Sequence, residues 1–274
     1  MKITRLLPCL CAALFAASTA VRAQAQPLVF AVNEGITYRV SPLATVDRFS
    51  GIADDLGKLL KQPVKIQPVT DYKELAAGLA DKRYDMAYVH PAHHSIRAMQ
   101  NSGYSLVALT RGFTEYKASF MVRKDSTVSS LADLKGKKIG GPDEDSITSV
   151  MMRATLRDAL GAEVLPTTYV RLQDAVPFMV ENHFVEAGVS ASRAVVKSWL
   201  DKGGKVAHTS RPVPIKHLIA SGKLSAEQRA LLTDYFVALD QTEAGKKRLE
   251  AMYVPGFLVS DQAALLGLGK WLGL

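Results

Sequence analysis

The chain has only two cysteines, Cys9 and Cys11, and both lie within its first 25 residues. This segment has a basic start, an apolar run from Leu6 to Ala17 and two small-x-small sites ending at Ala23 and Ala25. That pattern is typical of a secretory signal peptide, so we predict that residues 1–25 are removed. The rest of the chain has no thiol, which excludes disulfides and thiolate chemistry.

Long apolar runs and basic runs are also missing. The apolar part of the signal is too short for a membrane span, which needs about 20 residues, and no later segment is suitable either. Residues 1–25 hold three of the 34 basic residues and none of the 26 acidic ones, so their removal lowers the formal net charge from +8 to +5. No cluster of basic and aromatic residues suggests a nucleic-acid partner. A weak positive field would instead attract anions.

The sequence motifs of common enzyme classes are absent as well. The chain has no Gly-x-Ser-x-Gly elbow, no P-loop and no Gly-x-Gly-x-x-Gly signature. An acid–base pair built from Glu34 or Glu186 and a histidine is the remaining route to catalysis. The missing motifs favour a protein that is not an enzyme, has no cofactor and binds its ligand unchanged.

The chain after residue 25 alternates short apolar strands with helical patterns, which predicts an α/β fold with mixed, mostly parallel sheets. The expected strands are 28–33, 64–69, 85–89, 105–109, 118–122, 137–141, 166–170, 185–190 and 205–210. The expected helices are 46–61, 75–82, 91–103, 130–134, 150–160, one beginning at 174, and then 226–239, 243–252 and 261–272. Everything after the extended segment 211–214 is predicted to be helical.

One stretch, Asp145-Ser-Ile-Thr-Ser149, gathers three hydroxyls where a strand ends and a helix begins. A helix N-terminus has unpaired N–H groups and a partial positive charge, so it suits a small oxyanion. A serine before a helix can equally be a simple N-cap, and both interpretations stay open. Ligands of open α/β sheets lie beyond the carboxyl ends of the strands. The other candidate loops are therefore 33–38, 70–72, 90–94, 110–116 and 171–173.

Several patterns occur in the order found in a known family. They are Thr70-Asp-Tyr-Lys-Glu-Leu75, His90-Pro-Ala-His-His94, Tyr116-Lys-Ala-Ser119, Ser130-Leu-Ala-Asp-Leu-Lys-Gly136 with the hydroxyl stretch after it, and Val185-Glu-Ala-Gly188. In these the chain resembles the periplasmic binding proteins of phosphate, phosphite and phosphonate ABC transporters, over most of residues 28–220. The resemblance implies a two-lobed type II periplasmic binding protein, or Venus flytrap. Lobe 1 would be residues 26–116 and 213–274, lobe 2 residues 117–212, with two crossover segments as the hinge.

The resemblance also implies which side chains bind the ligand. By motif position, Ser146, Thr148 and Ser149 would hold the phosphoryl group, and Tyr72 and Tyr116 would line the same cleft. The further candidates are His93, His94, Gln173 and Glu186. Arg193 and Lys216 fall near positions where other members have acids that pair the amine of aminoalkylphosphonates. We therefore expect a ligand without a primary amine.

These patterns predict a monomeric, periplasmic solute-binding protein. It would capture a phosphonate-, phosphite- or phosphate-like oxyanion and deliver it to an ABC permease in the inner membrane. Two alternatives stay open. One is a ligand sensor that docks on a membrane receptor. The other is a metal-binding protein that uses His90, His93 and His94, although a metal site needs three or four ligands and imidazoles can also hydrogen-bond an anion.

Overall fold

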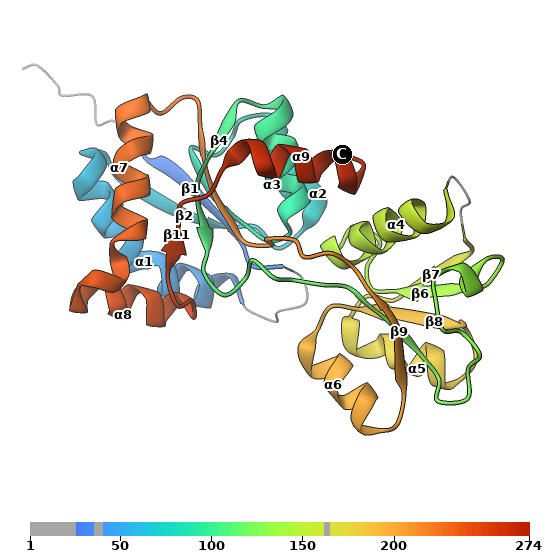
Figure 1. Ribbon diagram of the computed structural model, residues 1–274. Helices are drawn as coiled ribbons and strands as arrows, with labels where there is room; N and C mark the ends of the chain where they lie inside the picture. Colours follow the sequence, from blue (N-terminus) through green and yellow to red (C-terminus); the bar gives the residue numbers. More distant parts are fainter. Residues whose placement is uncertain (1–25, 36–40, 162–164) are drawn as a thin grey trace, which may run out of the picture.

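A computed structural model describes residues 26–35, 41–161 and 165–274 of the chain. The predicted signal peptide, with Cys9 and Cys11, and Tyr38 of the first candidate loop lie outside these residues. The strands form two separate mixed sheets, each flanked by helices (Figure 1). The α/β class predicted from the alternation is confirmed.

The first sheet has the strand order β11-β4-β10-β3-β1-β2. Its strands are β1 (Leu28–Asn33), β2 (Val64–Pro68), β3 (Met86–Val89), β4 (Tyr104–Thr110), β10 (His217–Ser221) and β11 (Phe257–Leu258). Strand β1 pairs in parallel with β2 and β3, whereas β10 runs antiparallel between β3 and β4. The helices of this half are α1 (Pro42–Leu60), α2 (Tyr72–Ala80), α3 (Ala92–Asn101), α7 (Ala226–Val237), α8 (Glu243–Met252) and α9 (Gln262–Leu272). A 3-10 turn (Leu239–Gln241) lies between α7 and α8.

Strand β10 corrects the expectation that everything after residue 214 is helical. All five of its residues are buried, and it lies in the middle of the sheet with a partner on each side. A short run that is buried on both faces has no alternation of polar and apolar residues, so its periodicity does not distinguish a strand from a helix. The two-residue strand β11 is too short to leave a pattern.

The second sheet has the strand order β7-β6-β8-β5-β9. Its strands are β5 (Ser119–Val122), β6 (Ile139–Gly141), β7 (Thr167–Tyr169), β8 (Ala187–Ser190) and β9 (Lys205–Thr209). Strand β6 is parallel to β7 and β8, and β5 is antiparallel to β8 and β9. The helices here are α4 (Ile147–Leu160), α5 (Val176–Glu181) and α6 (Arg193–Asp201), with 3-10 turns at Ala132–Leu134 and Gln173–Ala175.

Two extended segments connect the sheets and pair with each other. One leads from β4 into β5 and the other from β9 into β10 (Figure 1). Tyr116 and Val213 form an antiparallel bridge, with N···O distances of 3.3 and 2.9 Å. Ala118 and Ser210 add two more bonds of 2.9 Å, one of them to the Ser210 hydroxyl. The bridge lies at the predicted lobe boundaries, 116/117 and 212/213, which we keep as a prediction.

The two halves also touch away from these segments. Val150 and Met151 of α4 belong to the same buried apolar cluster as Ile96 of α3 and Leu265 and Leu272 of α9. The N-terminal part of α4 therefore faces helices that cover the first sheet. Among the helices described, none is both long and apolar enough to cross a membrane.

Candidate functional site

A short loop, residues 142–145, leads from β6 to helix α4, whose N-cap is Ser146. The Ser146 Oγ accepts the Ser149 N–H and donates to the Ser149 Oγ, both at 3.2 Å, and the Ser149 hydroxyl donates to the Pro142 carbonyl oxygen at 3.1 Å. The N-cap interpretation therefore accounts for both serine hydroxyls. The backbone N–H groups of Ile147 and Thr148, in the first turn, have no partner within the helix by geometry.

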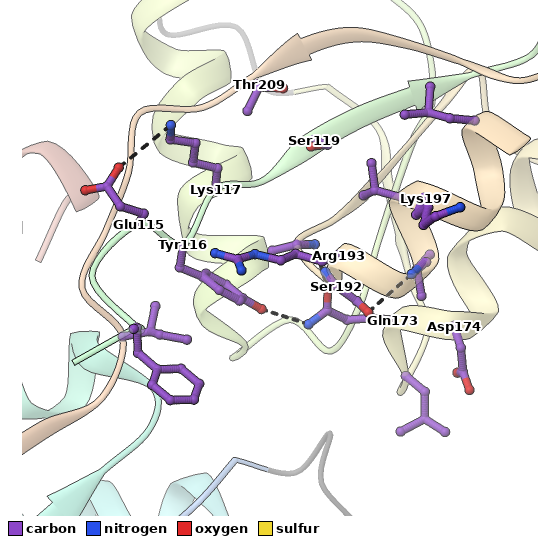
Figure 2. A pocket seen from close by; sticks show the side chains of 18 residues that line it. Glu115, Tyr116, Lys117, Ser119, Gln173, Asp174, Ser192, Arg193, Lys197 and Thr209 are labelled. Carbon is purple, nitrogen blue, oxygen red and sulfur yellow. Dashed lines mark hydrogen bonds and ion pairs between the residues drawn. The ribbon is translucent and has the colours of Figure 1, made fainter. Parts of the chain in front are cut away.

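Thr148, Tyr116 and Gln173 form a hydrogen-bonded chain. The Gln173 Oε1 accepts bonds of 2.7–2.9 Å from Ser190 Oγ and from the N–H groups of Ala191 and Ser192. Three donors on one oxygen fix the orientation of the amide, so its Nε2 donates to the Tyr116 hydroxyl at 2.9 Å (Figure 2). That hydroxyl is 3.2 Å from Thr148 Oγ1. The chain joins the first crossover segment to α4 and to the ends of β7 and β8.

The histidine pair His93–His94 lies in the first turn of α3, behind the N-cap Pro91. The two rings are 4.1 Å apart, and the Tyr72 ring is 5.6 Å from that of His94. Both histidines are buried, with 2% and 6% of their surface exposed. Within the described residues, His93 Nδ1 and both ring nitrogens of His94 have no hydrogen-bond partner. Leaving such an atom unpaired costs about 1–3 kcal/mol, so these nitrogens are candidate ligand contacts.

Both imidazoles are neutral at neutral pH. Burial, together with Arg97, lowers the pKa of His94 to about 4, and Asp145 in the loop before α4 opposes this shift. Burial also lowers the pKa of His93 well below its ordinary value, helped by the His94 ring and by Arg97. Val150 and Met151 of α4 belong to the same buried apolar cluster as Ala92 and Ile96, which flank the histidine pair on α3.

His90, the third histidine of this loop, turns toward the first strand. Its Nδ1 is 3.0 Å from the Glu34 carbonyl oxygen, and the Glu34 carboxylate makes two bonds, of 2.8 and 2.9 Å, to Arg48. In the part of the chain that the structure describes, no group of three or more His, Cys, Asp or Glu side chains is placed to hold a metal ion. The three histidines thus do not form the cluster on which the metal alternative depends.

Glu186 is not brought together with the other candidates. It precedes β8. Its carboxylate accepts a 2.7 Å hydrogen bond from the Ser126 hydroxyl and forms a 3.3 Å ion pair with Arg123. The Gln173 network is built on Ser190, at the opposite end of the same strand. The sequence already contained a signal that Glu186 lies apart from the other candidates. Glu186 precedes its strand, whereas ligands of such sheets lie beyond the carboxyl ends of the strands. Ser192, which the sequence interpretation missed, follows the carboxyl end and caps α6 just as Ser146 caps α4.

A pocket of about 1060 Å³ opens beside this network (Figure 2). Its lining includes Tyr116 and Gln173, Ser192 and Arg193 at the start of α6, and Phe113 and Ile215 from the segments that reach the first sheet. Lys216 does not line it: its ammonium is buried 4.0 Å from the centre of the Phe113 ring, and burial lowers its pKa to about 8. Of the two cations expected to oppose an amine, only Arg193 faces this space.

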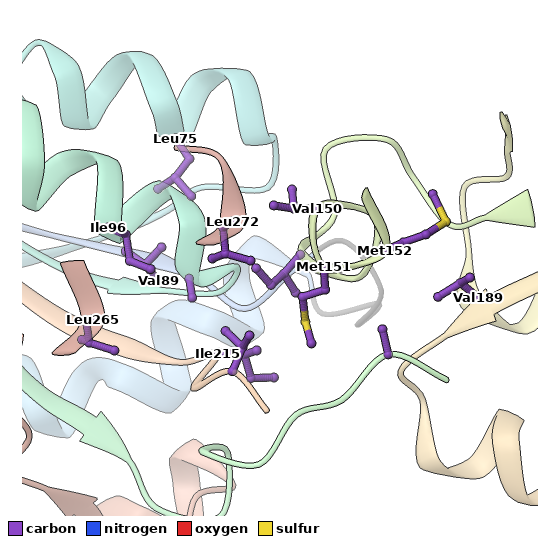
Figure 3. Packing of buried hydrophobic residues seen from close by; sticks show 14 of the residues in the cluster. Leu75, Val89, Ile96, Val150, Met151, Met152, Val189, Ile215, Leu265 and Leu272 are labelled. Atoms are coloured by element: carbon purple, nitrogen blue, oxygen red, sulfur yellow. The ribbon is translucent and has the colours of Figure 1, made fainter. Parts of the chain in front are cut away.

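Apolar side chains of α4 share a buried cluster with side chains of α2, α3 and α9. Figure 3 shows Val150 of α4 on the side that faces Leu272 of α9, with Ile96 and Leu75 beyond, whereas the Met151 side chain points away from Leu272. All five side chains are buried. The histidine pair and the first residues of α4 are not among the side chains that line the pocket.

A family model described as the periplasmic substrate-binding protein of phosphonate ABC transporters matches residues 35–265. XAC2383 from Xanthomonas citri, bound to chloride, is 14% identical, with a TM-score of 0.73 over 90% of this chain and 97% of that one. PhnD1 from Prochlorococcus marinus, in complex with methylphosphonate, is 18% identical, with a TM-score of 0.65 over 89% and 96%.

A binding protein component of an ABC phosphonate transporter from Pseudomonas aeruginosa, PA3383, is 20% identical. Its TM-score is 0.61, over 90% of this chain and 85% of that one. At these identities the likeness concerns the fold. It confirms the predicted two-lobed architecture with two crossover segments.

Proposed function

The chain belongs to the periplasmic substrate-binding proteins of phosphonate ABC transporters, and from that premise we propose that it captures a small phosphorus oxyanion between its two lobes. It would bind the ligand unchanged, act as a monomer and deliver the ligand to a permease in the inner membrane. Residues 1–25 would direct it to the periplasm. Closure of the lobes would sequester the ligand from solvent.

The observation that carries this proposal is the buried histidine pair with unpartnered ring nitrogens beside the start of α4. An oxyanion there would accept a hydrogen bond from His94 and from the first N–H groups of α4. The positive ends of the α3 and α4 dipoles would add a favourable field. The ligand would thus supply the partners that the imidazoles lack.

The other side chains would play distinct roles. We propose that Thr148 turns its hydroxyl to the ligand, because its present partner Tyr116 lies on the crossover segment, which would move when the lobes close. Ser146 and Ser149 would keep the loop in shape through their mutual bonds. Tyr72 would hold the His94 ring from the side, and Gln173 would fix Tyr116.

An organic substituent on phosphorus would extend into the pocket beside Tyr116 and Gln173. Three cations, Lys117, Arg193 and Lys197, line that pocket against two acids, Glu115 and Asp174, so a cationic ammonium there would meet a net positive lining. Substituents without an amine would fit this site better. Apolar groups can rest on Phe113 and Ile215, which line the same space.

Thermal unfolding with a panel of ligands tests the proposal. The dialysed protein is heated with methylphosphonate, phosphite, phosphate, acetate or Zn²⁺. At 100 times its Kd a ligand stabilises the native state by about 2.7 kcal/mol, which raises the Tm by roughly 5–10 °C in a protein of this size. We expect this shift with at least one phosphorus oxyanion and none with acetate. No shift with any phosphorus oxyanion, or a shift with Zn²⁺ alone, overturns it.

A further inference from the structure

We propose that the pocket beside Tyr116 and Gln173 binds a carboxylate, so that the preferred ligand is a phosphonocarboxylate, a phosphonate whose carbon chain ends in a carboxylate. The inference rests on the proposed function, since it names the class of ligand that the same site takes. The phosphonate would be held at the start of α4, and the carboxylate would pair with Arg193, the first residue of α6.

The walls of the pocket come mainly from the second half of the protein. Ser119 of β5, Thr209 of β9 and Arg193 of α6 line it, whereas Phe113 and Ile215 lie on the segments that lead to the first sheet. Closure of the lobes would therefore leave most of the walls in place. Pockets of about 300–1,000 Å³ hold drug-sized ligands. A volume of about 1060 Å³ thus has room for a ligand much longer than methylphosphonate.

The charged side chains of the lining differ in whether they are already paired. Lys117 and Glu115 form an ion pair with each other at 3.8 Å, and Lys197 pairs with Asp201 of the same helix at 2.6 Å. Within the described residues, no acid forms an ion pair with Arg193. The Arg193 guanidinium is therefore the cation of this pocket that is left to pair with a ligand.

The charge balance of the lining fits a single negative charge. Three cations face two acids, Glu115 and Asp174, which leaves one net positive charge. Asp174 forms no ion pair with Arg193 and so does not occupy the guanidinium. A carboxylate has one charge, and its two oxygens can accept two parallel hydrogen bonds from a guanidinium. A second phosphonate, with up to two charges, would exceed this balance.

Hydrogen bonds connect the pocket to the start of α4. The Thr148 hydroxyl is 3.2 Å from that of Tyr116, which accepts a 2.9 Å bond from Gln173. The other end of the Gln173 amide accepts the Ser192 N–H at 2.9 Å, directly before Arg193 (Figure 2). Thr148 and the start of α6 are therefore at most about 12 Å apart. A phosphonate and a carboxylate joined by two methylene groups, with a hydrogen bond at each end, span a similar distance.

Calorimetry at pH 7.5 with three phosphonates tests the inference. 3-Phosphonopropionate and 3-phosphonopropionamide have the same phosphonate and the same chain, and they differ only in the charge of the far end. Methylphosphonate lacks that end altogether. We expect the carboxylate to bind about tenfold more tightly than the amide, as for one charge-assisted hydrogen bond at a partly exposed residue. Because this gain is electrostatic, it should shrink when NaCl is raised from about 50 to about 500 mM.

Substitutions identify the partner of the carboxylate. Arg193→Gln removes the guanidinium from an exposed position, so the carboxylate-to-amide ratio of affinities should fall toward one while methylphosphonate still binds. Asp174→Asn removes an acid of the lining and should raise the ratio. Lys202→Gln is the matched control. It removes the same charge, but Lys202 pairs with Glu181 and does not line the pocket, so the ratio should stay native.

Equal binding of the carboxylate and the amide to the native protein overturns the inference. An Arg193→Gln protein that keeps the native ratio also overturns it, since the carboxylate would then be recognised elsewhere. Failure of all three ligands to bind overturns the proposed function itself. Binding of methylphosphonate therefore distinguishes the two failures.

Discussion

The indole N–H of Trp271 donates a 2.6 Å hydrogen bond to the carboxylate of Asp158, and so ties the C-terminal helix α9 to the end of α4. The Trp271 carbonyl oxygen also accepts a bond from Arg157, and the Arg211 guanidinium lies 4.0 Å above the indole ring. Helix α9 covers the first sheet and α4 the second. This contact therefore connects the two halves in addition to the crossover segments.

The Trp271–Asp158 bond should favour the arrangement in which the halves touch. Asp158→Asn weakens the acceptor, so we expect ligand affinity to fall about two- to five-fold, the size of one exposed hydrogen bond. Calorimetry with the best phosphorus oxyanion measures the change. Asp201→Asn is the control, since Asp201 is an exposed acid that pairs with Lys197 within one helix. Equal affinities of the two variants would contradict the prediction.

Removal of the Thr148 hydroxyl should weaken ligand binding. Thr148→Val keeps the shape of the side chain, and loss of a hydrogen bond to a charged ligand costs about 1.5–3 kcal/mol, or roughly 10- to 100-fold in Kd. The double change Ser146→Ala/Thr148→Ala should bind at least as weakly, because it also removes the N-cap of α4.

Thr155→Val is the control for this experiment. Thr155 is buried on the same helix, and its hydroxyl bonds the Met151 carbonyl oxygen at 2.8 Å within the helix. Its loss should lower stability without affecting the Kd. If Thr148→Val binds as tightly as the native protein, Thr148 is not part of the cradle.

Stability should fall steeply in mild acid. Burial lowers the pKa of His90, His94 and His217 from 6.5 to about 4, so between these pH values the unfolded chain binds more protons than the native one. The free energy of unfolding should therefore fall as the pH falls from 6.5 to 4, by roughly 1 kcal/mol per pH unit for each histidine. Above pH 6.5 this contribution is complete and constant.

Urea unfolding at pH 7.5, 6.0 and 5.0 measures the slope. Because His183 has an exposed ring, His183→Asn should reproduce the native slope, whereas His217→Asn should reduce it. His217 is held by Ser95 and by the Pro214 carbonyl oxygen in the first half. A free energy of unfolding that is flat from pH 7.5 to 5.0 would show that these histidines are not buried as neutral rings.

A primary amine on the ligand should be unfavourable. Methylphosphonate should bind more tightly than 2-aminoethylphosphonate, because Arg193 lines the pocket that the amine would enter. Arg193→Glu should narrow or reverse the preference. Lys202→Glu is the control and should leave the preference unchanged. It makes the same change of net charge, but Lys202 pairs with Glu181 and does not line the pocket. Tighter binding of the aminoalkyl ligand to the native protein would refute this prediction.

Local patterns predicted the parts of the site that depend on neighbouring residues. The N-cap at Ser146 and the end of the helix at Leu160 follow from one strand, one helix and the residues at its ends. The orientation of Gln173 could not be predicted, because it depends on three donors from residues 190–192. The unpartnered nitrogens of His94 were equally inaccessible, since the burial of that ring depends on neighbours from other elements, such as Tyr72 of α2.

The paired crossover segments have a mechanical consequence. Tyr116 and Val213 bond to each other across the two connecting chains, and so do Ala118 and Ser210. Such a ribbon bends easily across its flat face but resists sliding of one strand along the other, because sliding would break these bonds. We infer that the two lobes rotate relative to each other about a single hinge axis. The N-termini of α3 and α4 would then approach each other in the same alignment at every closure, because lateral displacement of one lobe along the other is restricted.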